Sequence, residues 1–201
     1  MNKVGIVVGH ARGTGAVSHD GVNEWWWNNA LAKILKRRLE DLGVSAKIYY
    51  RKSSLGYTSA MKDLARRIKA DDMQLCLELH FNSFSEKSHG YEFLYWWGSS
   101  KSKRFAKCMA EEFGDHVKGI SPRKAWITGA KGYKALWLKS WNKKKADSRR
   151  GAEFCYYTHC PAIICEPGFA SNPSEWSIMN RDIDDIIDAY VGGIVTYLST
   201  Q

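Results

Sequence analysis

Three short, largely apolar runs of strand length end next to a residue that can bind a metal ion or carry a proton. The runs and these residues are 3–8 with His10, 74–79 with His80, and 161–165 with Glu166. Runs of this length bounded by turn residues are typical of buried strands. In open α/β sheets, the ligand crevice lies outside the carboxyl ends of the strands. The pattern therefore predicts an α/β fold in which the three residues converge.

Glu24 lies at the start of a predicted helix. Asn23 before it is a favourable N-cap, and the segment that follows ends at Gly43. Within this segment, leucines recur at the spacing of one helix face, at Leu31, Leu35, Leu39 and Leu42. The side chain of Glu24 is therefore expected to project from the first helical turn.

These four residues supply one open zinc site and one free carboxylate. Catalytic zinc is usually held by three protein ligands, and two His with one Glu is a known set that leaves the fourth position to water. We therefore expect His10, Glu24 and His80 to bind zinc, Glu166 to transfer protons, and the chain to be a metal-dependent hydrolase. Taken singly, each residue also has a structural explanation, such as a favourable helix dipole for Glu24.

A set of ordered motifs runs from residue 3 to about residue 198. They are Val-Val-Gly-His10, Glu24 at a helix start, Glu-Leu-His80-Phe-Asn82-Ser83, Gly90-Tyr-Glu92-Phe, and Pro161-Ala-Ile-Ile-Cys-Glu166-Pro-Gly168-Phe169-Ala-Ser-Asn172. In order and spacing they resemble the zinc-dependent N-acetylmuramoyl-L-alanine amidases of the Amidase_3 type. The resemblance implies the same three zinc ligands, with Glu166 as catalytic carboxylate. It also implies a single α/β domain with a twisted, mostly parallel central sheet of about six strands.

The reaction that this resemblance implies is hydrolysis of the amide bond between N-acetylmuramic acid and L-alanine in bacterial peptidoglycan. Two positions depart from the family pattern. Residues 11–15 replace a Gly-rich turn, and Pro167 replaces Thr, but neither change removes a group that the mechanism needs. Two alternatives stay open: another zinc peptidase acting on the stem peptide, or a catalytically inactive wall-binding protein. The chain lacks the His-Glu-x-x-His motif of many zinc peptidases, which disfavours the first.

The length of 201 residues and the absence of a linker or repeat predict one catalytic domain over residues 1–201, without a separate wall-binding module. Periodicity predicts further elements at 44–50 (strand), 59–70 (helix), 90–97 (strand), 103–116 (helix) and 181–198 (helix).

The chain is basic, with 30 Lys and Arg against 21 Asp and Glu. Six of these cations lie in residues 139–150, so attraction to a polyanion is expected. Anionic bacterial wall polymers fit this charge, whereas no nucleic-acid-binding motif accompanies the segment. A solvated loop that maintains solubility is the other explanation. We expect Lys143 and Lys144 to contact the substrate.

Three consecutive tryptophans, Trp25, Trp26 and Trp27, follow Glu24. Successive helix residues point in different directions, so the three rings cannot all be buried in one core. We expect one of them to face the cleft or solvent. Trp25 is the predicted substrate contact among them, and Asn82 is the other predicted contact near the metal ligands.

The N-terminal apolar stretch covers only residues 4–9, so it is interpreted as a strand rather than as a signal peptide. Five cysteines without metal-ligand spacing are expected to be reduced and mostly buried. Together these features predict synthesis in the host cytoplasm, no membrane insertion, and action on the cell wall after release, as for a bacteriophage endolysin. A mother-cell lysin of a spore former is the second interpretation.

Overall fold

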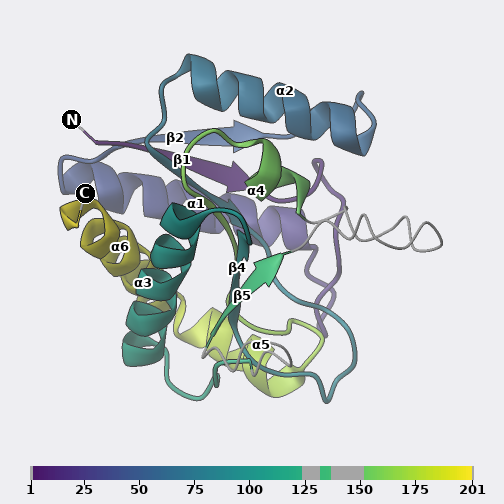
Figure 1. Ribbon diagram of the computed structural model, residues 1–201. Coiled ribbons are helices and arrows are strands. Elements are labelled where there is room, and N and C mark those ends of the chain that lie inside the picture. Colours follow the sequence, from purple (N-terminus) through teal and green to yellow (C-terminus); the bar gives the residue numbers. More distant parts are fainter. Residues whose placement is uncertain (1, 124–131, 137–151, 201) are drawn as a thin grey trace.

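A six-stranded sheet flanked by helices forms the centre of the molecule (Figure 1). The computed structural model describes residues 2–123, 132–136 and 152–200. Along the chain the elements are β1 (Lys3–Val8), α1 (Glu24–Asp41), β2 (Ser45–Tyr50), α2 (Tyr57–Ala70), β3 (Leu75–Leu79), β4 (Glu92–Trp96), α3 (Ser100–His116), β5 (Tyr133–Leu136), α4 (Glu153–Tyr157), β6 (Ala162–Glu166), α5 (Pro173–Arg181) and α6 (Ile183–Ser199).

The strand order is β2-β1-β3-β6-β4-β5. The first four strands of this order are mutually parallel, whereas β4 runs antiparallel to β6 and β5 runs parallel to β4. The predicted α/β fold with a mostly parallel six-stranded sheet is therefore confirmed.

Both faces of the sheet are covered by helices, as its continuous apolar strands require. In β1, Val4, Ile6 and Val8 pack in one core cluster with residues of α1, α3 and α6. The intervening Val7 packs in a second cluster with residues of α2 and α4. This alternation follows from the two-residue period of a strand. The molecule is thus a three-layer sandwich (Figure 1).

The register of the central strands aligns their carboxyl ends. Val8 of β1 pairs with Leu79 of β3, and Leu79 pairs in turn with Cys165 of β6. The residues that follow these strand ends therefore emerge side by side. The long connection after β1 returns to the same edge, where α1 begins at Glu24.

The N-cap of α1 fixes the direction in which this helix starts. The Asn23 side chain accepts a hydrogen bond from the Trp25 amide at 3.1 Å, as its N-cap position predicts. At the other end, Gly43 has φ of 75°, a left-handed conformation that favours glycine.

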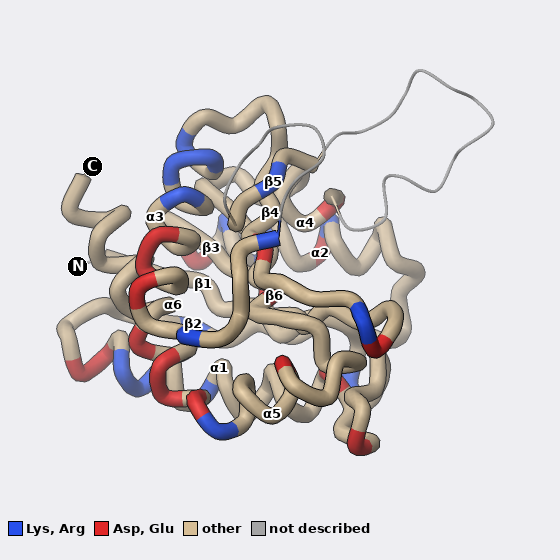
Figure 2. The backbone as a smooth tube through the Cα atoms, turned by 90° about the horizontal axis from the view of Figure 1, so that it is seen from below, with Lys and Arg blue, Asp and Glu red and all other residues tan. Residues whose placement is uncertain are grey.

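All five cysteines are free and four of them are buried, which confirms the prediction for the thiols. Within the described ranges, no helix is both long and apolar enough to cross a bilayer. Basic and acidic residues are interspersed over the described helices (Figure 2). Most of the net positive charge belongs to residues 124–131 and 137–151, which hold eight of the Lys and Arg residues but one acidic residue.

Candidate metal centre and active site

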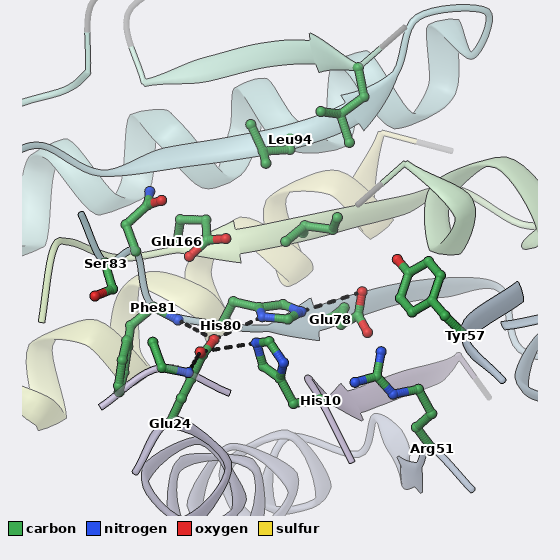
Figure 3. A pocket seen from close by; sticks show the side chains of 14 residues that line it. His10, Glu24, Arg51, Tyr57, Glu78, His80, Phe81, Ser83, Leu94 and Glu166 are labelled. Atoms are coloured by element: carbon green, nitrogen blue, oxygen red, sulfur yellow. Dashed lines mark hydrogen bonds and ion pairs between the residues drawn. The ribbon is translucent and has the colours of Figure 1, made fainter. Parts of the chain in front are cut away.

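His10, Glu24 and His80 converge at the carboxyl edge of the sheet (Figure 3). One potential ligand atom from each residue lies within 4.8 Å of the others. Glu24 Oε2 lies 3.0 Å from His10 Nε2, and Glu24 Oε1 lies 2.8 Å from His80 Nδ1. The two imidazole rings meet edge to face, with centroids 4.8 Å apart. The three side chains therefore present their nitrogen and oxygen atoms to a common point.

Backbone amides hold the Glu24 carboxylate in this position. The Ala16 amide donates to Oε2 at 2.9 Å, and the Phe81 amide donates to Oε1 at 3.2 Å. Each carboxylate oxygen is thus shared between one backbone amide and one imidazole. Such outer contacts orient metal ligands and are part of a working metal site.

The donor set fits a zinc ion, because two imidazoles and one carboxylate are the ligands of many catalytic zinc sites. Burial disfavours ionisation of Glu24, yet hydrogen bonds from His10 and His80 outweigh it and hold the pKa of this carboxyl well below its usual range. Burial also opposes protonation of His80, but Glu24 and Glu78 raise its pKa well above the ordinary value. The site therefore stabilises positive charge, as a metal cation requires.

Close packing of backbone around the ligands requires glycine at position 9. A Cβ atom at Gly9 would lie 2.5 Å from His80 Cε1, from His80 Nε2 and from the carbonyl oxygen of Leu79. His10, the metal ligand that follows Gly9, has φ of 64°, which is uncommon for a residue other than glycine. Such conformations persist where the surrounding structure fixes them, often at functional sites.

Gly9→Ala is expected to displace His80, since the carbonyl oxygen of Leu79 belongs to the sheet edge and cannot move freely. We expect a loss of about 1 to 3 kcal/mol in unfolding free energy, as for other overpacked positions, together with weaker zinc binding. Urea unfolding of the metal-free protein and chelator competition for zinc measure the two effects. Gly56→Ala is the control, because a Cβ atom at Gly56 meets no atom within 4 Å. Unchanged zinc affinity in Gly9→Ala would contradict this packing argument.

Glu166 ends β6 and its carboxylate points toward His80 (Figure 3). Its Oε2 atom is buried and has no hydrogen-bond partner among the described residues. Burial raises the pKa of Glu166 to about 8; His80 opposes the rise, and the nearby Glu24, Glu92 and Glu78 carboxylates add to it. A carboxyl with a pKa near neutrality is suited to accept and return a proton.

The raised pKa predicts how the metal-free protein responds to pH. Because the neutral carboxyl is favoured in the folded state, its stabilising effect is complete below pH 4.5, the ordinary pKa, and is lost as pH rises through about 8. Gln is neutral throughout, so Glu166→Gln is expected to raise the unfolding midpoint by several degrees at pH 9 and hardly at pH 5. Thermal unfolding in the presence of EDTA measures this difference. An equal effect at both pH values would contradict it.

Asn82 lines the same cavity and is oriented by the buried Glu92, which is paired with the exposed Arg123. Its Nδ2 atom donates to Glu92 Oε1 at 3.1 Å, and Arg123 Nη1 donates to the same oxygen at 2.6 Å. Glu92 is paired with Glu166 across β4 and β6. The Asn82 amide is thereby held beside the metal ligands and the free carboxylate.

The tryptophan triplet divides as its helical position predicts. Trp25 and Trp27 are buried in the core, whereas Trp26 is 48% exposed. Trp25 is 6% exposed and does not line the cavity, so the structure gives no support to a substrate contact by its ring. Lys143 and Lys144 lie outside the described residues.

The cavity has a volume of about 630 Å³ and contains residues that the sequence analysis did not identify. Glu78 had a sequence signal, because a charged residue two positions before His80 in a strand must share its face. Ser83 belongs to the His80-Phe-Asn82-Ser83 motif but was assigned no role, and Arg51 and Tyr57 had no signal that the local sequence reveals. Apolar residues complete the lining, namely Leu94, Leu136 and Ile164.

The fold and the site define a class of protein, an α/β domain with a His-Glu-His cluster and a free carboxylate at the strand ends. The chain belongs to the Amidase_3 family of N-acetylmuramoyl-L-alanine amidases, whose family model matches residues 4–196. The reaction of this family, cleavage of the bond between N-acetylmuramic acid and L-alanine in peptidoglycan, is the one that the motifs predict. No curated protein sequence matches the chain.

Several solved structures share the fold. The catalytic domain of the amidase CwlV from Bacillus (Paenibacillus) polymyxa var. colistinus is 22% identical, with a TM-score of 0.76 over the whole of both chains. The amidase Ami1 from Mycobacterium smegmatis is 18% identical, with a TM-score of 0.78 over 100% of this chain and 98% of that one. The catalytic domain of the CD27L endolysin targeting Clostridia difficile is 20% identical, with a TM-score of 0.74 over 98% of each chain.

Proposed function

We propose that this amidase depends on zinc held by His10, Glu24 and His80, and that Glu166 is its catalytic acid and base. The convergence of three ligand atoms within 4.8 Å carries the proposal. The unpartnered oxygen of Glu166, which faces the same cavity, supports the second part.

The residues have distinct tasks in this mechanism. When bound, zinc supplies a Lewis acid that polarises the amide carbonyl and makes water more acidic. Glu166 takes a proton from the attacking water on its carboxylate and returns it to the nitrogen of the departing alanine. Asn82, held by Glu92, is positioned to hydrogen-bond the substrate beside the reacting bond.

Mass spectrometry of digested peptidoglycan tests the reaction. Amidase activity releases stem peptides that begin with the free amino group of L-alanine, and glycan strands that retain the lactyl carboxylate. A different new terminus within the stem would instead indicate a zinc peptidase, and unchanged fragments would indicate a wall-binding protein without activity.

The proposal extends to the biological setting. We infer a catalytic domain that acts on the bacterial wall after release, as in a bacteriophage endolysin, and that has no nucleic-acid partner. Similarity to the CD27L endolysin catalytic domain supports this setting. The excess of cations in residues 124–131 and 137–151 supports attraction to anionic wall polymers.

If Lys143 and Lys144 steer the enzyme to the wall, lysis should weaken as salt rises. Screening shortens the Debye length from about 10 Å at 0.1 M to about 3 Å at 1 M ionic strength. Neutralising Lys143, Lys144 and Lys145 together is expected to flatten this dependence in a turbidity assay on purified sacculi. The parent's salt profile in the triple variant would instead identify a solvated loop.

A further inference from the structure

The cavity extends to two sides of the metal ligands, and the two ends differ in charge (Figure 3). Phe81, Ser83 and Glu166 lie on one side of His10 and His80, and no Lys or Arg side chain of this end lines the cavity. Arg51 and Tyr57 lie on the other side. The first end therefore offers a substrate no cation, whereas the second end offers Arg51.

Arg51 is held in place without an acidic partner. It directly follows β2, and its guanidinium lies over the ring of Tyr57, the first residue of α2, at 5.4 Å from the centroid. Among the described residues it forms no ion pair and no side-chain hydrogen bond. Its neighbour Lys52, by contrast, pairs with Asp63 at 3.2 Å. Arg51 thus lines the cavity with N–H donors that no described residue accepts, and a ligand could accept from them.

Glu78 is the acidic group nearest to this end of the cavity. Its carboxylate is buried, and its Oε2 atom lies 3.6 Å from His80 Nε2, so its charge is directed at the metal ligand. Among the described residues, no carboxylate lies within ion-pair distance of the Arg51 guanidinium. The guanidinium is planar, lies on an aromatic ring and has N–H donors without acceptors among the described residues. A carboxylate suits such a group, because the guanidinium can bind it through two parallel hydrogen bonds.

We propose that Arg51, supported by Tyr57, forms a subsite for the free carboxylate of the stem-peptide residue next to the released alanine. The inference rests on the proposed function, because it assigns the direction of the substrate across the same site. The glycan side of the cleaved bond carries hydroxyl and acetamido groups, whereas the stem peptide carries carboxylates. The peptide therefore runs from the metal ligands toward Arg51, and the sugar lies toward Ser83. A cavity of about 630 Å³ has room for such a fragment.

Two muramyl dipeptides that differ in one group test the subsite. Both compounds keep the γ-carboxylate of the second residue. At the α position of that residue, N-acetylmuramoyl-L-alanyl-D-glutamate has a free carboxylate, whereas N-acetylmuramoyl-L-alanyl-D-isoglutamine has a carboxamide. Turnover of either compound by the zinc-loaded parent tests the proposed function. Binding of the two released dipeptides, followed by calorimetry, tests the subsite separately. We expect the parent to prefer the carboxylate by about tenfold to a hundredfold, the range of one charge-assisted contact.

Substitutions then assign the preference to Arg51. In Arg51→Gln the ratio of the two affinities is expected to fall to within about twofold, and Arg51→Lys is expected to restore part of it, because Lys keeps the charge but not the two-pronged geometry. Lys52→Gln removes the adjacent cation and should leave the ratio unchanged. Equal affinity of the parent for both dipeptides would overturn the subsite even if the protein is an active amidase. So would a loss of affinity in Arg51→Gln and in Arg51→Lys that is the same for the two dipeptides.

Discussion

Glu166→Gln is expected to yield a folded, zinc-loaded protein that binds sacculi but lyses them about 10⁴-fold more slowly than the parent. A positioned acid or base typically contributes about 10² to 10⁴ in rate, and Glu166 is assigned both tasks. Gln preserves the size and hydrogen-bonding reach of the side chain but cannot take a proton. The relevant measurements are release of L-alanine amino groups per zinc bound and metal content by atomic spectroscopy.

A second buried glutamate provides the matched control. Glu153 in α4 hydrogen-bonds Thr58 at 3.0 Å and does not line the cavity. Glu153→Gln should therefore keep a rate within about threefold of the parent's. Loss of a positioned acid or base would instead lower the rate by about 10² to 10⁴. Near-parent turnover in Glu166→Gln would remove this residue from catalysis. Loss of zinc in the same variant would make Glu166 a ligand and would reopen the assignment of the other three.

The convergence at the sheet edge was accessible from sequence because it depends on strand ends. Apolar runs locate the strands, and a parallel sheet brings their carboxyl ends to one edge. The direction of β4 relative to its neighbours could not be predicted from sequence, because an apolar run has the same pattern in a parallel and in an antiparallel strand. The predicted strand 90–97 exists as Glu92–Trp96, yet it runs against β6 and opposes Glu92 to Glu166.

Three short elements were missed for different reasons. Strand β5 has four residues and helix α4 has five, so neither is long enough to display a period. Helix α5 could have been predicted, because Asn172 at the N-cap and Pro173 at the first position are a recognised start signal. Its cap is realised in the structure, where the Asn172 side chain accepts from the Ser174 amide at 3.0 Å.

The remaining parts of the site depend on tertiary contacts. The amides of Ala16 and Phe81 orient Glu24, but amides carry no residue-specific signal. Arg51 is one of many cations in the sequence, and its lack of an acidic partner follows only from the positions of β2 and α2. That one of the three tryptophans is exposed, in contrast, followed from helix geometry alone, because adjacent residues cannot share one face; that it is Trp26 did not.

His80→Ala is expected to lose most of its zinc and, with it, measurable lysis. Removing a residue that only orients a ligand typically costs about 10- to 100-fold in metal affinity, so removing a ligand itself should cost more. The loss also leaves Glu24 Oε1 without its imidazole at 2.8 Å, while the Phe81 amide still holds the carboxylate. Two ligands then remain, and catalytic zinc is usually held by three.

The experiment needs a histidine whose removal should not matter. His89 is exposed and lies outside the metal cluster. Its hydrogen bond within the described part of the chain is to the nearby Lys87 carbonyl. His89→Ala should therefore retain one zinc per chain and the parent's rate, whereas His80→Ala should bind zinc at least 100-fold more weakly in chelator competition. Full metal content and full activity in His80→Ala would refute the ligand assignment. Full metal content without activity would instead place His80 beside the substrate, and another donor would have to complete the site with His10 and Glu24.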